Sequence, residues 1–115
     1  INDKFKSQIK NESIKVFRFD SVTAADNFQS SYFDFIYIDT DHSYETTIKE
    51  LRAWKTKIKD DGIIAGHDYM MGNWPKTLRY GVIEAVHQFC IEDNWQLIYL
   101  TADQTENLSF AIKRI

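Results

Sequence analysis

The chain has 115 residues, enough for one modest hydrophobic core but too few for two ordinary domains, so we expect a single domain over residues 1–115. Hydrophobic residues make up 43% and charged residues 27%, a composition typical of folded globular proteins rather than disordered ones. The formal net charge of −3 argues against a nucleic-acid partner, because proteins that bind nucleic acids usually carry a basic face.

Three features indicate the cytoplasm as the expected compartment. A single cysteine, Cys90, cannot form an internal disulfide and suits a reducing environment. No apolar run approaches the ~20 residues that a membrane helix needs, so we expect no membrane association. The polar start INDKFKSQIKNES does not resemble a signal peptide.

The first predicted elements are a strand, a short helix and a second strand. Residues 14–19 (IKVFRF) favour a strand, and Asp20 and Ser21 then offer a helix start. Residues 33–38 are apolar except for Asp34, which predicts a strand covered on both faces. Such strands are typical of parallel sheets.

A helix and a third strand follow. Ser43 is a candidate cap for this helix. Asp61 and Gly62 predict a turn, and residues 63–65 a short apolar strand. The apolar residues that repeat at helical spacing before the turn are Ile48, Leu51 and Ile58.

The remaining chain predicts a loop, a helix and two strands. Residues 70–81 hold the only proline and predict a loop, and residues 82–90 carry the apolar stripe of an amphipathic helix. Residues 95–100 and 108–115 predict two strands around a polar turn. This alternation of strands and helices is typical of an α/β fold with a parallel sheet and right-handed crossovers.

Two predicted strand ends carry clusters of ionisable side chains. Asp39, Asp41 and His42 follow one strand, and His67 and Asp68 follow the next. If the strands are neighbours, these groups meet at the sheet edge where ligands bind in such folds. Carboxylates and imidazole suit Mn²⁺ or Fe²⁺, and imidazole suits Mg²⁺ less well. A carboxylate or histidine that does not bind the ion could act as a general base.

Structural interpretations compete with these functional ones. An aspartate that follows a strand is usually a cap or turn residue when it is considered singly. Trp74 and Tyr80 are candidates for substrate contact, and a lid packed on itself is the alternative. His87 lies on the helix with the apolar stripe, which favours a structural role.

The phrases FDFIYIDTDHSYE, AWKTKIKDDG, IIAGHDY and GVIEAVHQF, in this order, resemble the carboxyl half of class I S-adenosylmethionine-dependent methyltransferases. The similarity is strongest to the small-molecule O-methyltransferase family and spans residues 14–115. It implies a partial Rossmann-like methyltransferase fold with three layers and a mainly parallel sheet that ends in an antiparallel hairpin. The family's strand order is 3-2-1-4-5-7-6, and the first two strands are expected to be missing from this chain.

The resemblance also implies roles for the strand-end clusters. Asp39, His67 and Asp68 would bind a metal such as Mg²⁺ or Mn²⁺, as in the metal-dependent members. Asp41 or His42 would take the proton from the hydroxyl of a small-molecule acceptor. The acceptor itself is not implied by the sequence.

For the cofactor, the resemblance places Asp20 and Ser21 beside the adenine of S-adenosylmethionine. The chain departs from the family pattern at Thr40, where glycine is usual, and at Asp60 and Asp61, which replace Pro-Gly. Its four glycines form no G-x-G pattern, so the glycine-rich cofactor turn of the family is absent from this sequence.

The missing strands would leave bare sheet edges, which invite pairing. We therefore expect residues 14–19 either to collapse onto the strand at 33–38 or to pair with a second copy, giving a homodimer. Three functions stay open: the acceptor-side half of a metal-assisted O-methyltransferase, a non-catalytic oligomerising module, and a metal-dependent hydrolase.

Overall fold

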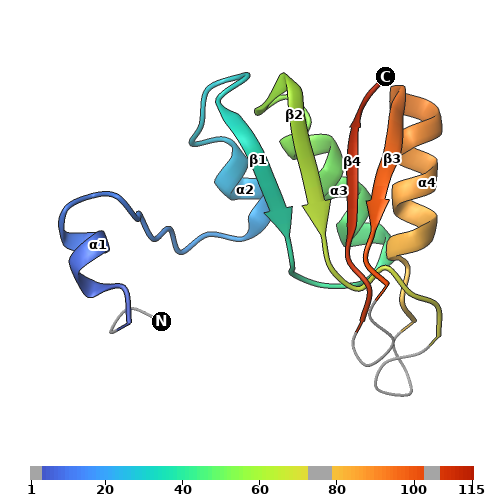
Figure 1. The fold of residues 1–115 in the computed structure, drawn as a ribbon, viewed down its shortest axis with the longest axis horizontal. Helices are drawn as coiled ribbons and strands as arrows, with labels where there is room; N and C mark the ends of the chain where they lie inside the picture. Colours follow the sequence, from blue (N-terminus) through green and yellow to red (C-terminus); the bar gives the residue numbers. More distant parts are fainter. Residues whose placement is uncertain (1–3, 73–78, 103–106) are drawn as a thin grey trace.

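A computed structural model describes residues 4–72, 79–102 and 107–115, which form one four-stranded sheet in the order β1-β2-β4-β3 (Figure 1). Its strands are β1 (Phe33–Ile38), β2 (Ile58–Gly66), β3 (Trp95–Leu100) and β4 (Phe110–Arg114). β1 and β2 are parallel, and β4 is antiparallel to both β2 and β3. This order equals the 4-5-7-6 part of the expected sheet, so the α/β class and the antiparallel terminal strand are confirmed.

Helices cover one face of this sheet. α3 (Tyr44–Trp54) and α4 (Val82–Asp93) lie behind it in Figure 1, and α2 (Ser21–Ala25) packs against α3. α1 (Lys6–Lys10) lies apart from the sheet. The described residues thus supply two of the three expected layers.

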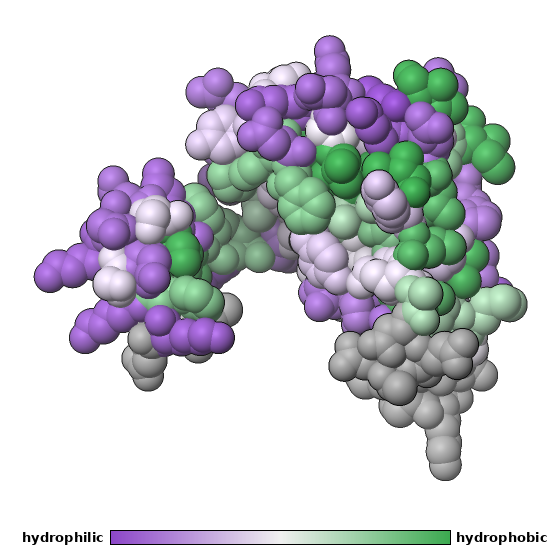
Figure 2. Space-filling model, in the orientation of Figure 1, coloured by the Kyte–Doolittle hydropathy of each residue, from purple (hydrophilic) through white to green (hydrophobic). Residues whose placement is uncertain are grey.

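The sheet's two faces differ because strand side chains alternate. One row of paired residues turns toward the helices: Ile36, Ile64, Ile112 and Leu97. The next row faces the other way: Tyr37, Ala65, Ala111 and Tyr99. In the described chain Phe35 is 56% and Tyr37 48% exposed, so the expectation that this strand is covered on both faces is wrong. Figure 2 shows apolar side chains gathered on this uncovered face.

The core lies between the sheet and the helices α3 and α4. Its fully buried apolar side chains come from both layers: Phe89, Leu51, Ile58, Ile64, Ile112 and Val86. The apolar stripe predicted for the helix that follows residue 81 is therefore confirmed, because α4 buries Val82, Ala85, Val86 and Phe89.

Two predicted helix starts are also confirmed. The Asp20 carboxylate accepts a hydrogen bond from the Thr23 amide at 3.1 Å, and the Ser43 hydroxyl accepts one from the Thr46 amide at 3.2 Å. Each satisfies a backbone donor that the first turn of a helix leaves without a partner.

Residues 14–19 were expected to form a strand, and this expectation is wrong. They belong to no strand of the described sheet, and Val16, Phe17 and Phe19 are each about half exposed. Among the described strands β1 has only β2 as a neighbour, so the segment has not collapsed onto β1 either. A β-favouring run without a partner strand lacks the hydrogen bonds that would hold it extended in a sheet.

The expected turn at Asp61 and Gly62 lies inside β2 instead. The register shifts between Phe33↔Ile58 and Phe35↔Ile63, so these residues belong to a bulge opposite β1. Gly62 fits there because a Cβ would lie 2.9 Å from the Asp34 carbonyl oxygen. Ile58 begins β2 rather than extending the helix, because its pairing with Phe33 of β1 outweighs the helical spacing of the sequence.

Among the helices that the structure describes, none is long and apolar enough to cross a membrane.

Candidate functional site

The two expected strand ends lie side by side because β1 and β2 pair in parallel. Ile38 is opposite Gly66, so Asp39 and His67 each follow a paired residue. The His67 amide also donates to the Ile38 carbonyl at 3.1 Å. The register therefore brings side chains from two distant parts of the chain to one rim.

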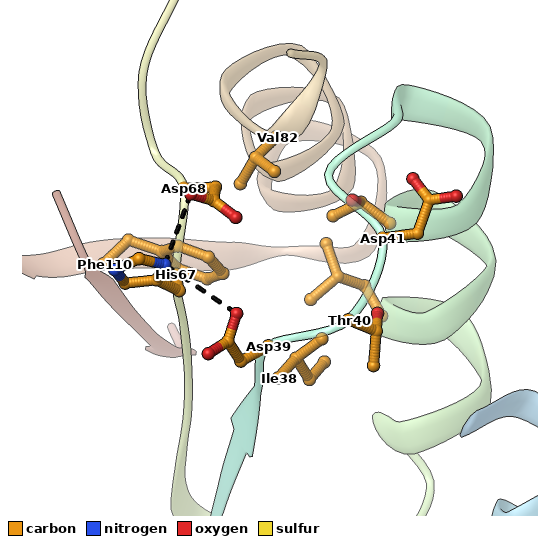
Figure 3. Close-up of a pocket in the computed structure, with 10 residues that line it drawn as sticks. Ile38, Asp39, Thr40, Asp41, His67, Asp68, Val82 and Phe110 are labelled. Atoms are coloured by element: carbon orange, nitrogen blue, oxygen red, sulfur yellow. Dashed lines mark ion pairs between the residues drawn. The ribbon is translucent and has the colours of Figure 1, made fainter. Parts of the chain in front are cut away.

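Asp39, His67 and Asp68 form a cluster at this rim, here called the Asp39–His67–Asp68 cluster. The His67 Nδ1 atom lies 3.7 Å from an Asp39 oxygen and 3.2 Å from an Asp68 oxygen (Figure 3). One ligand atom from each residue lies within 4.8 Å of the other two. Side-chain exposure falls from 57% at Asp39 to 31% at His67 and 15% at Asp68.

Asp68 is held in place by its backbone and by a neighbour. Its φ of 62° is in the left-handed region, where aspartate is one of the better tolerated residues. Asn107, just before β4, donates its side-chain amide to the Asp68 carboxylate. This anchoring aims one carboxylate of the cluster at His67.

The cluster borders a small cleft with a volume of about 10 Å³, close to the least that one water molecule needs. This volume is close to that of a single water molecule or ion. Its lining combines the rim with the apolar core: Ile38, Asp39, Thr40, Asp41, Thr47, Leu51, His67, Asp68, Val82 and Phe110.

Asp41 and His42 do not join the cluster. The Asp41 carboxylate accepts a hydrogen bond from the Ser43 amide at 2.6 Å, which lowers its pKa, and Figure 3 shows it beside α3, away from His67. The His42 ring packs against the Tyr80 ring with centroids 4.5 Å apart. Asp41 therefore holds the helix start, as the structural interpretation predicts for a single aspartate.

Asp20 and Ser21, the expected cofactor contacts, lie near the free edge of β1. The Thr23 hydrogen bond lowers the pKa of Asp20. The Ser21 hydroxyl accepts a hydrogen bond from the Trp54 indole at 2.9 Å. Ser21 also lines an apolar groove of about 250 Å³ along this edge, together with Phe28, Phe33, Phe35, Ile36, Tyr37, Ile38, Thr40 and Trp54.

Glu50 is a site residue that the sequence analysis missed. Its side chain is fully buried, and its two oxygens lie 2.6 and 2.7 Å from the Thr40 hydroxyl. Burial raises its pKa, and the negative charges of Asp41 and Asp20 raise it further. Helical spacing from Thr47 and Trp54 places Glu50 on the inner face, and this was the available signal.

The remaining candidates from the sequence are Trp74, Tyr80 and His87. Tyr80 is buried against His42, and Trp74 lies outside the described residues. His87 shares a hydrogen bond of 2.5 Å with the Tyr69 hydroxyl, in agreement with the structural role predicted for it.

Comparison with known families finds one match along more than half of the chain. A family described as a methyltransferase domain matches residues 3–69. This range includes all three members of the Asp39–His67–Asp68 cluster. No curated protein matches the chain.

Several solved structures share the fold at low sequence identity. The pyocyanin biosynthetic protein PhzM is 11% identical with a TM-score of 0.67, over 99% of this chain and 39% of its own. A putative rRNA-methylase from Clostridium thermocellum is 16% identical with a TM-score of 0.64, over 99% of this chain and 67% of its own. A SAM-dependent methyltransferase from Aquifex aeolicus is 13% identical with a TM-score of 0.62, over 96% and 61%. The chain thus spans between 39% and 67% of these structures.

Proposed function

Because the chain belongs to the methyltransferase-domain family, we propose that it forms the acceptor-side half of an S-adenosylmethionine-dependent O-methyltransferase assisted by a divalent cation. The observation that carries this proposal is the Asp39–His67–Asp68 cluster at the rim of two adjacent parallel strands. Ligands of open α/β sheets bind at this kind of edge.

The cluster's donor set fits a divalent cation. Asp39 and Asp68 offer carboxylate oxygens and His67 an imidazole nitrogen, which together suit Mn²⁺ better than Mg²⁺. A cation in this position would supply Lewis acidity that lowers the pKa of an acceptor hydroxyl. The three residues would hold it beside the cleft, and a bound acceptor would approach from the exposed side of Asp39.

His42 is the better candidate for the base that takes the acceptor proton. The lowered pKa of Asp41 makes its carboxylate a weak base, and its hydrogen bond to the Ser43 amide occupies one oxygen. His42 lies in the same connection and is oriented by the Tyr80 ring. In the proposed reaction the acceptor oxygen forms a bond to the methyl carbon while the carbon–sulfur bond breaks, and the proton passes to His42.

The cofactor would lie on the side of Asp20 and Ser21. S-adenosylmethionine would supply the methyl group on a sulfonium. Ser21 supports this placement because it lines the groove beside β1. We propose a small-molecule hydroxyl as acceptor, since the net charge of −3 does not favour a polyanion. The word rRNA in the name of the Clostridium thermocellum protein describes the substrate class of that protein, and the acceptor proposed for this chain does not rest on it.

Loss of a residue that only supports a metal ligand lowers metal affinity by roughly 10–100-fold. Asp39 is a proposed ligand itself, so its replacement with asparagine is expected to weaken Mn²⁺ binding by at least this factor. Titration calorimetry of the folded chain measures this affinity. D26N is the matched control, because Asp26 is an exposed aspartate outside the cluster and its loss should leave the affinity unchanged. A folded wild-type chain that binds no Mn²⁺, or a D39N variant that binds like D26N, would contradict the proposal.

The same calorimetry with S-adenosylhomocysteine tests the cofactor part. Binding that Mn²⁺ strengthens would support a complete active centre in this chain or in an assembly of it. Absence of binding in a chain that still binds Mn²⁺ would limit the proposal to an acceptor-side half that needs further residues.

We also propose that two copies pair through the free edge of β1. Each copy has one unpaired edge there and one β-favouring segment, residues 14–19, without a partner strand in the described sheet. Exchange of these segments would cover both and give a closed twofold dimer.

Light scattering should report a dimer for the wild type and a monomer for V16P, since proline removes an amide donor. The exposed Ile91 provides the control I91A, and a monomeric wild type would rule out the dimer.

A further inference from the structure

The strongest unassigned feature is a buried carboxyl that contacts the connection between β1 and α3. Glu50 has no solvent exposure, and both its oxygens lie within hydrogen-bond distance of a single hydroxyl, that of Thr40. Thr40 directly follows Asp39. A side chain on α3 is thereby tied to the segment that carries the first member of the cluster.

A second hydroxyl approaches the same carboxyl from α2. The Ser21 hydroxyl accepts a hydrogen bond from the Trp54 indole N–H, so its own O–H can donate to Glu50. The hydrogen bond between Ser21 and Glu50 lowers the Glu50 pKa and so opposes the effect of burial. The charged groups that act on Glu50 are Asp41 and Asp20, both negative. No ion pair among the described residues includes Glu50, and a buried charge without a counter-ion is costly. Burial and these two charges therefore act against ionisation of Glu50, and the Thr40 hydroxyl donates to its carboxyl oxygens.

The side chain of Asp39 is held weakly by its surroundings. Its backbone leaves the sheet after Ile38, and its carboxylate lies 57% exposed and 3.7 Å from His67. On one side of Asp39 lies the β1–β2 pairing, and on the other Thr40 is hydrogen-bonded to Glu50.

We infer that Glu50 is a positioning residue, which acts through the Thr40 hydroxyl to hold Asp39 opposite His67 and Asp68. The inference rests on the proposed metal site for its functional meaning. The hydrogen bonds themselves join α3 to the connection whether or not an ion is bound.

The variant T40V tests this inference because valine keeps the shape and removes the hydroxyl. We expect Mn²⁺ affinity to fall by about 10-fold, in the range known for outer-shell partners, and T40S to restore it. T56V is the matched control, since Thr56 is exposed and its hydroxyl donates to the backbone carbonyl of Ala53, away from the cluster. A purely structural role would lower the melting temperature of T40V and leave Mn²⁺ affinity of the folded protein unchanged, which would overturn the inference.

The variant E50Q provides a second readout, the pH dependence of stability. The pKa of Glu50 is raised in the folded state. The wild type therefore loses stability as the pH rises from 4.5, the ordinary pKa of glutamate, through the higher pKa of Glu50 in the folded protein. E50Q has no such loss, so its stability relative to wild type should rise over this window, while the exposed control E92Q shows no such trend. A wild type and E50Q that respond to pH alike would contradict a raised pKa at buried Glu50.

Hydrogen exchange separates this inference from the metal proposal. If the wild type binds no Mn²⁺, the metal proposal fails. The positioning role is then tested by the exchange rates of the Ser43 and Thr46 amides, which donate hydrogen bonds to Asp41 in the connection and to the cap residue Ser43. T40V should then exchange these amides faster than T56V does. Equal exchange in the two variants would overturn the inference by itself.

Discussion

Replacing Phe89 with alanine is expected to lower the free energy of unfolding by about 3–5 kcal/mol, the usual cost of removing a fully buried phenylalanine. Phe89 has no solvent exposure, and its ring lies 5.4 Å from the ring of Trp95 at the start of β3. The variant would leave a cavity between α4 and the sheet. Urea denaturation with an unchanged slope would measure the loss.

I91A provides the matched control on the same helix. Ile91 is 82% exposed, so its truncation should change the free energy of unfolding by no more than about 0.5 kcal/mol. Similar costs for the two variants would mean that α4 does not pack with Phe89 inward.

Replacing Gly66 with alanine is expected to cost about 1–3 kcal/mol of stability, the range for overpacking, and to weaken Mn²⁺ binding as well. An added Cβ would lie 2.6 Å from the Phe110 ring and 2.9 Å from the Ile38 carbonyl oxygen. β1 and β2 must therefore separate where they place Asp39 beside His67. Urea denaturation and titration calorimetry measure the two effects.

The variant F110L separates the two clashes. It removes the ring atoms that the new Cβ would meet and leaves the Ile38 oxygen in place, so part of the cost of G66A should disappear in the F110L background. Strictly additive costs would show that the ring clash is not the cause. Unchanged Mn²⁺ affinity in folded G66A would show that the strand spacing does not control the site.

The rim of the sheet was predictable because local signals agree there. Two apolar runs each end in ionisable residues, and parallel pairing of such runs brings their carboxyl ends together. The structure confirms that Asp39, His67 and Asp68 meet. The predicted caps at Asp20 and Ser43 are also present, because a cap depends only on the first turn of its own helix.

Other features depend on contacts that local sequence does not encode. The β-favouring residues 14–19 form no strand because no partner strand of the described sheet lies beside them. Asp61 and Gly62 lie in a bulge of β2 instead of forming a turn, because Ile58 and Ile63 on either side of them pair with β1. Glu50 is buried although its side chain is ionisable, and the Thr40 hydroxyl, ten positions away in sequence, is brought to it by the turn before α3.

The sequence by itself determined the α/β class, the helix starts, the apolar stripe of α4 and the two strand ends that meet at the rim. These follow from periodicity and capping, which act over a few residues. Only the tertiary structure decided which face of β1 stays bare, that Asp41 holds a helix start instead of joining the cluster, and that Glu50 supports Thr40. The reason is physical: burial, strand register and buried hydrogen bonds depend on which distant segments come into contact.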